Sequence, residues 1–318
     1  MPAAPVTFGD LRATFGDTRV DFFGNWLVDP GTGLPGPGAS TWTAQLGGVT
    51  LGLAPYLWAE APVPFGLDGL RTSDTPRPLA HGLISGAPDR LGSKAIDLPW
   101  EIIADTEASA LLYYEALAAA WTPARVDVEL AFTSPARSLS FWGRPRRLSA
   151  DLEDVQHGVI YGAAQFEALD PRGYGAELQD SVNLGVSVGG LGFPHGFPHG
   201  FGAGATSGTL PLLNDGNAPS ERSVVTLRSP GATLTNPRLE ILETGEALQL
   251  NLSITGSDEL VLDFFNRTAI LNGSVSRAES VARPGSRWWA LPAGTSTLKF
   301  TGSGDGTAEI RYRPAWIL

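Results

Sequence analysis

The hydrophobic pattern of the N-terminal half predicts strands. Residues 125–132 alternate between apolar and polar side chains, which is the period of a half-buried strand. Residues 93–103 and 158–169 are also interpreted as strands. In residues 125–132, the apolar positions are Val126, Val128, Leu130 and Phe132. We therefore expect these four side chains on the buried face of a sheet.

Residues 106–121, TEASALLYYEALAAAW, break this pattern and predict a helix. Their apolar positions at helical spacing are Leu111, Tyr114, Leu117 and Trp121. Asp105 or Thr106 can cap the N-terminus of the helix, and Pro123 stops it. A single amphipathic helix between strands must lie across a sheet, so the N-terminal half is predicted to be an α+β domain.

The C-terminal half consists of short strand-like segments separated by Gly, Asn, Pro and Asp. The segments are 223–229, 237–242, 246–254, 259–265, 267–273, 286–291, 296–302 and 307–313. In residues 246–254, Leu248, Leu250, Leu252 and Ile254 alternate with polar residues. This arrangement is typical of a β-sandwich, and the whole chain is therefore predicted to be mainly β.

A Gly-rich segment of low charge, residues 181–204, lies between the two halves and contains the repeat GFPHGFPHGF. We interpret it as a connector. The predicted organisation is an N-terminal domain over 1–180, a connector over 181–204 and a sandwich over 205–318. Residues 28–80 are loop-rich, and loops of that length usually have a function or become ordered by a partner.

Composition narrows the possible functions. The 318 residues include no cysteine, which excludes disulfides, thiolate catalysis and iron–sulfur clusters. Residues 1–185 hold 12 basic and 22 acidic side chains, a net charge of −10, out of −11 for the whole chain. Such an acidic half is unsuited to binding phosphate backbones. The N-terminus has no secretory signal pattern, and no apolar run reaches the length of a membrane span. We therefore expect synthesis in a cytosol and no membrane partner.

No catalytic constellation emerges from the sequence. Ser187 lies in a G-x-S-x-G pattern, but the following GGLGFPHG cannot form the helix that a nucleophile elbow needs. His195 and His199 are four residues apart, but Pro198 and the surrounding glycines prevent a regular helix there. We expect no catalytic residue, cofactor or metal, and keep a Ser187 hydrolase as the weakest alternative.

Two features are candidate partner contacts. Arg144, Arg146 and Arg147 form a compact cationic group in the acidic half, although a salt-bridge cluster at a strand end is the simpler interpretation. Trp288 and Trp289 are adjacent, so on a strand they point to opposite faces. We expect Trp289 in the core with Leu291, and Trp288 on the other face, either covered by a neighbouring segment or open to a partner.

The C-terminal segments resemble the distal tail protein of long-tailed, siphovirus-type bacteriophages, including the minor tail proteins of actinobacterial phages. An Asn-Pro strand opens the similarity at Asn236. A D…R…LNG hairpin follows at Asp263, Arg267, Leu271, Asn272 and Gly273. A W-x-L-x-x-G segment matches at Trp289, Leu291 and Gly294, and a Y-R-P-x-W end at Tyr312, Arg313, Pro314 and Trp316. The helix at 106–121 and FEALDPRGYG at 166–175 agree with the N-terminal domain of that family.

The resemblance implies a structural virion protein that is not an enzyme. It implies a ring of copies of the chain, usually six, closed by the N-terminal domain, with a galectin-like sandwich at the periphery. Its implied partners are the major tail tube protein, the tail hub or tail-associated lysin and receptor-binding or other tip proteins. DNA would only pass through the ring, and the location would be the tail tip, or baseplate, of the virion.

A carbohydrate-binding tip protein is the main alternative. A galectin-like sandwich with an exposed tryptophan could stack on sugar rings and contact host cell-wall glycan. Such a site also needs convergent polar groups, and a galectin-like topology alone does not imply sugar binding.

Overall fold

The structure, a computed structural model, describes residues 42–60, 62, 70–77, 81, 83–84, 86, 90–123, 125–184 and 206–318. The short strands β1 (Ala13–Phe15), β2 (Thr18–Val20) and β3 (Trp26–Leu27) are described by their backbone and form a three-stranded sheet. The chain divides into two compact units. Unit 1 comprises residues 1–63, 96–137 and 144–166, and unit 2 comprises residues 64–95, 138–143 and 167–318.

Unit 1 is built on one large sheet whose strand order is β5-β4-β12-β13-β14-β11-β6. The strands are β4 (Thr43–Leu46), β5 (Val49–Leu51), β6 (Tyr56–Trp58), β11 (Lys94–Ile103), β12 (Val128–Thr133), β13 (Ser138–Asp151) and β14 (Val159–Ala168). Alternate residues of β11 are buried, from Lys94 to Ile102. The strand predicted at 93–103 is thus confirmed.

The helix α1 (Glu107–Ala120) packs on this sheet, as predicted, and the 3-10 helix η1 (Val155–His157) lies against it. The Tyr114 ring stacks on Trp100 of β11 with 6.0 Å between centroids. The indole Nε1 of Trp121 donates to the Gln165 carbonyl of β14 over 3.2 Å. Thr106 is the N-cap, because its Oγ1 accepts a hydrogen bond from the Ser109 amide.

Two details of the predicted pattern in unit 1 were wrong. Leu111 is 37% exposed, and Ala110 instead lies on the buried stripe with Leu117. A small residue at 110 lets the helix approach the sheet, which rotates Leu111 outward. Val126 is 70% exposed, because it precedes β12, which begins only at Val128.

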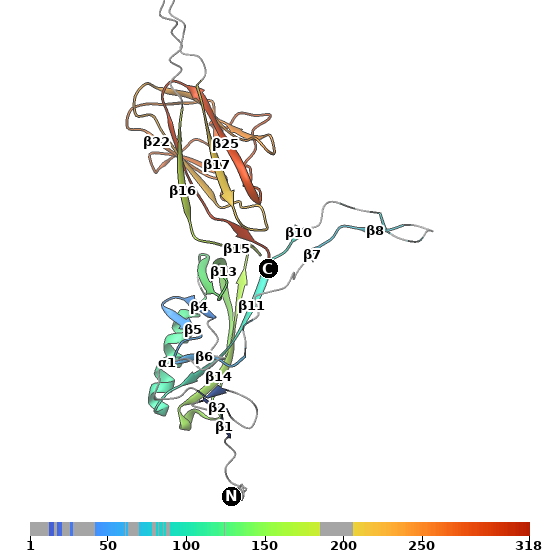
Figure 1. Ribbon diagram of the computed structural model, residues 1–318, viewed down its shortest axis with the longest axis vertical. Helices are drawn as coiled ribbons and strands as arrows, with labels where there is room; N and C mark the ends of the chain where they lie inside the picture. Colours follow the sequence, from blue (N-terminus) through green and yellow to red (C-terminus); the bar gives the residue numbers. More distant parts are fainter. Residues whose placement is uncertain are drawn as a thin grey trace, which may run out of the picture. The chain divides into compact units, whose positions relative to one another are not determined.

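Unit 2 is a sandwich of two antiparallel sheets (Figure 1). The first has the order β16-β26-β18-β22-β23-β24, formed by β16 (Leu178–Asn183), β18 (Ser223–Arg228), β22 (Glu259–Asp263), β23 (Thr268–Leu271), β24 (Val275–Ser276) and β26 (Thr307–Tyr312). The second has the order β17-β25-β19-β20, formed by β17 (Thr206–Asn214), β19 (Leu234–Ile241), β20 (Glu246–Gln249) and β25 (Gly294–Ser303), with β21 (Ser253–Ile254) paired to β19. The predicted mainly-β class is confirmed.

Smaller elements complete unit 2. The strand β15 (Gly173–Tyr174) pairs with β13 at Ser140 and with β27 (Ala315–Trp316). Two further sheets have two strands each. One pairs β7 (Leu70–Arg71) with β10 (Arg90–Leu91), and the other pairs β8 (Thr75–Pro76) with β9 (Leu83–Ile84). The 3-10 helix η2 (Ala278–Ser280) follows β24.

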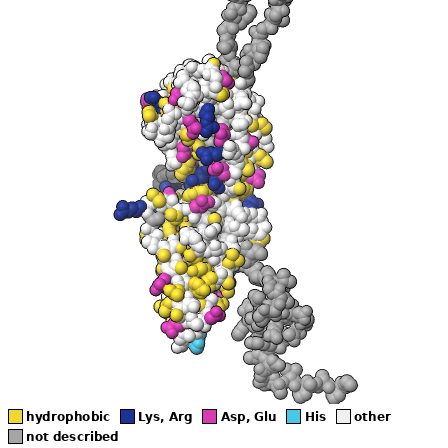
Figure 2. All heavy atoms as spheres, turned by 90° about the vertical axis from the view of Figure 1, so that its left-hand side faces the viewer, with side chains coloured by type: hydrophobic (Ala, Val, Ile, Leu, Met, Phe, Trp, Pro, Cys, Tyr) yellow, Lys and Arg dark blue, Asp and Glu magenta, His cyan; other side chains and the backbone are white. Residues whose placement is uncertain are grey.

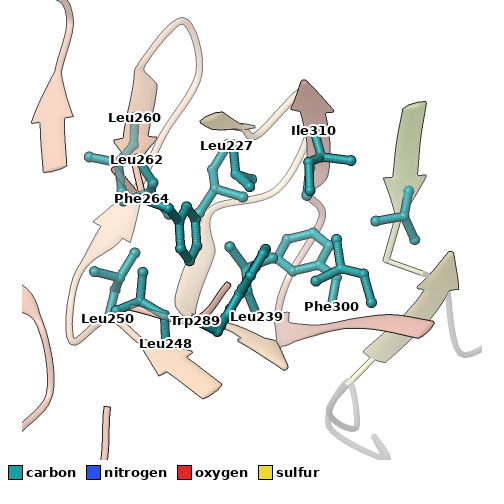
Figure 3. Close-up of a cluster of buried hydrophobic side chains, with 14 of the residues drawn as sticks. Leu227, Leu239, Leu248, Leu250, Leu260, Leu262, Phe264, Trp289, Phe300 and Ile310 are labelled. Atoms are coloured by element: carbon teal, nitrogen blue, oxygen red, sulfur yellow. The ribbon is translucent and has the colours of Figure 1, made fainter. Parts of the chain in front are cut away.

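The sandwich core lies between the inner faces of its two sheets. Figure 3 shows apolar side chains from both sheets pointing toward one another, including Leu227, Leu260, Leu262, Ile310, Leu239, Leu248 and Phe300. Trp289 lies among them with its ring centroid 4.0 Å from that of Phe264. Leu248, Leu250 and Ile254 are fully buried and Leu252 partly so, as the alternating pattern predicted.

Residues 246–254 do not form one continuous strand, because the partner strand β19 contains an irregularity between Thr235 and Arg238. There Asn236 adopts a positive φ of 50°, which Asn tolerates better than most residues. Pro237 next to it has no amide hydrogen to place in the sheet. The Asn-Pro motif thus marks the position where β20 ends and β21 begins.

Candidate assembly surfaces

The outer face of α1 is apolar, although no described segment of the chain covers it. Ala108, Leu111, Leu112, Ala116 and Ala119 are all exposed, and Leu112 is the most exposed of the large ones at 64%. Residues three and four apart share a helix face, so these five form one surface. The only charged side chains on α1 are Glu107 and Glu115, and the exposed Glu115 lies within this otherwise apolar surface. Figure 2 shows hydrophobic side chains gathered on the side of the molecule where α1 lies in Figure 1.

A helix that is apolar on both faces is normally buried on both. The inner face of α1 meets the sheet of unit 1, which leaves the outer face as a candidate contact with another molecule. The periodicity of residues 106–121 predicts one apolar stripe, whereas the helix has exposed apolar side chains outside that stripe as well.

The outward side of the sheet in unit 1 is polar and acidic where β11 and β14 adjoin. Asp97 and Glu101 alternate with the buried residues of β11. Gln165 of β14 donates to Asp97 Oδ1 over 2.9 Å. The charge of Glu101 raises the pKa of the exposed Tyr161 hydroxyl. This face therefore presents negative charge and hydrogen-bonding groups.

The predicted cationic group lies on β13, where Arg144, Arg146 and Arg147 project from its middle. Arg144 Nε is 3.0 Å from Asp127 Oδ1, and both side chains are about 40% exposed. That ion pair agrees with the simpler, salt-bridge interpretation for Arg144. Arg146 and Arg147 are exposed. Their role as partner contacts stays a prediction.

Trp289 lies in the core with Leu291, as expected, but Trp288 does not point to an opposite face, because the segment is not a strand and both rings pack against the same core. Residues 286–290 are irregular, and Leu291 forms a single bridge to Ser220. Trp289 is 1% exposed and Leu291 fully buried in the core. Trp288 is half-buried, with its ring 5.3 Å from Phe264 in an edge contact. Trp288 is thus partly covered by its own chain, and a partner contact at its remaining surface stays a prediction.

A charged cluster inside unit 2 was not visible in the sequence. Arg172 pairs with Asp170 through two nitrogens, Nε to Oδ1 at 2.8 Å and Nη2 to Oδ2 at 2.9 Å. Tyr174 donates a 2.5 Å hydrogen bond to Asp170 Oδ2. Burial and the negative charge of Asp170 raise the pKa of Tyr174. The Arg172 Nη1 also donates to the Pro219 carbonyl, which ties this segment to the sandwich.

Arg222 lies beside this cluster between aromatic rings. Its guanidinium carbon is 3.9 Å from the centroid of Trp142, 4.2 Å from Phe265 and 5.1 Å from Tyr174. Its Nε is buried without a hydrogen-bond partner, and burial lowers its pKa. These contacts hold together segments that are far apart in sequence, so only the folded structure could reveal them.

Ser187, His195 and His199, which the sequence analysis considered and did not expect to form a catalytic or metal site, lie outside the described residues, as does the GFPHGFPHGF connector. Within the described part of the chain, no group of three or more His, Asp or Glu side chains could hold a metal ion. No helix in that part is long and apolar enough to cross a membrane. What the described residues offer is a set of surfaces for contact with other molecules.

Comparison with known families identifies the second half of unit 2. Residues 215–316 match the SPP1 Dit family, described as the siphovirus-type tail component, C-terminal domain. The resemblance inferred from the sequence motifs is thereby confirmed for these residues. No curated protein matches the sequence significantly.

Solved structures extend the similarity of fold to most of the chain. The crystal structure of SPP1 Dit (gp 19.1), described as a paradigm of the hub adsorption apparatus in phages that infect Gram-positive bacteria, has a TM-score of 0.62 at 14% identity. The similarity covers 86% of this chain and 98% of that one. Two structures of the phage P2 baseplate in its activated conformation, with Ca and with Sr, have TM-scores of 0.49 at 9% and 10% identity, over 86% of this chain and 97% of theirs.

Proposed function

We propose that this chain, whose residues 215–316 are a siphovirus-type tail component C-terminal domain, is a structural protein of the tail tip of a long-tailed phage. It would join the tail tube to the tail hub and reside in the virion. The observation that carries the proposal is that the family match at 215–316 coincides with a Dit fold over 86% of the chain. The proposed role is mechanical and not enzymatic.

The chain would act as a ring of copies of itself, six by analogy with the family it resembles. The outer face of α1 supports self-association, because an apolar helix face gains free energy when it leaves water. Closed rings form when one surface of a subunit meets a different surface of the next. We therefore assign the α1 face to one side of the subunit contact.

The acidic side of the sheet in unit 1 would suit a surface that DNA passes without binding. Asp97 and Glu101 repel phosphate, whereas a cationic wall would hold the exiting genome. A ring whose lumen is lined by arginine, or whose acidic side faces outward, would contradict this assignment.

The tail tube protein and the tail hub are the proposed partners on the two sides of the ring, with receptor-binding or other tip proteins at the periphery. Arg146, Arg147 and the exposed part of Trp288 are the proposed contact residues. Substitution of Arg146 and Arg147 by Ser together should weaken capture of tube or hub protein and leave the fold unchanged.

Native mass spectrometry and negative-stain imaging of the purified chain, alone and mixed with the tube and hub proteins of the same phage, test the proposal. We expect a closed ring with a central hole, in at least one of these mixtures. A chain that stays monomeric in every mixture, and binds neither protein, would overturn it.

A further inference from the structure

A cluster of arginine and apolar side chains reaches the surface of unit 2 where β18, β26 and the turn after β22 adjoin. The Arg222 guanidinium packs on Trp142 and Phe265, and the Arg313 guanidinium carbon is 5.4 Å from the Trp142 ring centroid. Phe265 is 37% exposed, and Leu169, which is 44% exposed, donates its amide hydrogen to the Trp142 carbonyl. These five residues all belong to unit 2 and form what we call the aromatic–arginine surface.

The two arginines of this surface lie close together although both are positively charged. Ser223 of β18 pairs with Tyr312 of β26, which brings Arg222 and Arg313, the next residues of the two segments, opposite each other. Burial, and to a smaller extent the charge of Arg313, lower the pKa of Arg222. Like charges placed opposite each other are destabilising, so this arrangement favours a site that an anion completes.

No carboxylate of the described residues forms an ion pair with Arg222. Asp170 attracts Arg222 electrostatically. However, both oxygens of Asp170 already accept hydrogen bonds from Arg172 and Tyr174. The charge of Arg222 is therefore only partly neutralised within the described part of the chain.

Arg313 is also weakly neutralised. Its nearest printed ion pair joins its Nε to Glu177 Oε2 over 3.9 Å, and Glu177 is 45% exposed. Glu177 is shared with Arg311 of β26, which is 42% exposed and also 3.9 Å away. Exposed ion pairs of this length contribute little. The Nη1 of Arg313 donates to the Gly175 carbonyl over 3.1 Å, which positions the guanidinium without changing its charge.

The apolar part of the surface favours a protein segment over a free ion. A free carboxylate or phosphate would leave Phe265 and Leu169 in water, whereas an apolar side chain of a partner would cover them. Aromatic residues and arginine are also the residues enriched at the centres of protein–protein contacts.

We propose that the aromatic–arginine surface docks an acidic segment of a partner protein. A carboxylate of the segment would meet Arg222 and Arg313, and an adjacent apolar side chain would pack on Phe265. This surface goes beyond the proposed role in the ring, and it rests on that role only for the choice of candidate partners.

The surface is held in place before a partner arrives. The amide and the carboxamide of Asn266 both donate to the Asp263 carboxylate, over 2.9 and 2.7 Å, which fixes the turn that carries Phe265. The Phe264 amide donates to the Ser223 carbonyl over 3.0 Å and joins this turn to the start of β18. A surface fixed in advance loses little conformational freedom on binding.

Biolayer interferometry of the purified full chain against each separately purified tail protein of the same phage tests the proposal. Peptides that tile the strongest binder then locate the segment. We expect at least one tail protein to bind through a segment that contains Asp or Glu. Arg313→Gln and Phe265→Ser should each weaken that binding at least about tenfold, the usual consequence of losing a charge-assisted hydrogen bond or a central aromatic contact.

A double-mutant cycle identifies the contact itself. Replacing the carboxylate of the segment by its amide should weaken binding by a similar factor, and adding Arg313→Gln should then weaken it little further. Arg222 is left unchanged, because its contacts with the aromatic rings also stabilise the fold.

Arg228→Gln is the matched control. Arg228 lies on the same strand, β18, about 20 Å from Arg222, and its side chain is 47% exposed. Its replacement should leave binding unchanged, and circular dichroism checks that every variant is folded. Binding that survives Arg313→Gln combined with Phe265→Ser, or that survives the amide substitution, would overturn the proposal.

Two further outcomes would also overturn it. One is that no tail protein binds, and the other is that inorganic phosphate binds more tightly than the peptide. Ring formation is measured separately by native mass spectrometry, so a chain that forms rings but fails these tests refutes the docking surface and leaves the proposed function standing.

Discussion

Arg222 stabilises unit 2 through contacts between its guanidinium and aromatic rings. Its guanidinium stacks on Trp142 and Phe265, while burial opposes its charge. Because a partly desolvated cation–π contact contributes up to about 2 kcal/mol, Arg222→Ala should lower the free energy of unfolding by about that amount. Chemical denaturation measures it. Arg311→Ala on the exposed sheet face should change it by less than about 0.5 kcal/mol, and an equal effect of both variants would contradict this account.

The raised pKa of Tyr174 leads us to expect that the free energy of unfolding falls at alkaline pH. Burial and the charge of Asp170 raise its pKa in the folded chain above the ordinary value of 10.0. Its contribution to folding is therefore complete below about pH 10 and is lost as the pH rises further, because the unfolded chain releases the proton first. Tyr174→Phe should reduce the slope of unfolding free energy against pH above 10. Tyr161→Phe, which removes an exposed hydroxyl, should leave most of that slope, and a slope unaffected by Tyr174→Phe would contradict the prediction.

The hairpin between β23 and β24 depends on its Asn-Gly turn. Asn272 and Gly273 have positive φ values of 50° and 71°. The Asn272 side chain accepts from the Glu259 amide and donates to Asp258, each over 2.9 Å. Asn272→Ala removes both bonds and leaves a residue that tolerates the left-handed region less well than Asn does, so a loss of about 1–2 kcal/mol in unfolding free energy is expected. Thermal denaturation that matches the wild type would contradict this.

At the outer face of α1, one substitution separates assembly from folding. Leu112→Glu places a charge at a position that is already 64% exposed, so the fold should persist while the ring is lost. Leu213→Glu is the control, since Leu213 is 53% exposed but lies on β17 of unit 2. Native mass spectrometry should find rings for the control only. Rings of unchanged stability in Leu112→Glu would remove α1 from the subunit contact.

Elements defined by strong local patterns were predictable, and those defined by distant contacts were not. The strand-like segment at 93–103 and the cap and stop signals around residues 106–121 correctly predicted β11 and α1. The stretch at 286–291 looks like a strand but is irregular, because its Trp289 is held by the core rather than by a sheet partner. The interruption at 250–252 follows from Asn236 on another strand, which no local window contains.

At the scale of the whole molecule, the sequence motifs revealed the sandwich, but they did not reveal the surfaces that would serve assembly. The matches at Asn236, Asn272 and Trp289 lie at a strand irregularity, a tight turn and the core, where backbone geometry and packing leave few acceptable residues. By contrast, the outer face of α1 is defined by its exposure. Exposure depends on what the rest of the chain leaves uncovered, so sequence periodicity alone could not reveal this surface.

The proposed function requires copies of this chain to form the ring between the tail tube and the tail hub. Electron cryo-microscopy of the tail tip of a phage that encodes the chain tests it most directly. We predict copies of the chain closed into one ring around the lumen, with α1 at the contact between neighbours and the tube and hub on either side. A tail tip in which the chain is absent, or is attached at the periphery as separate single copies, would contradict the account.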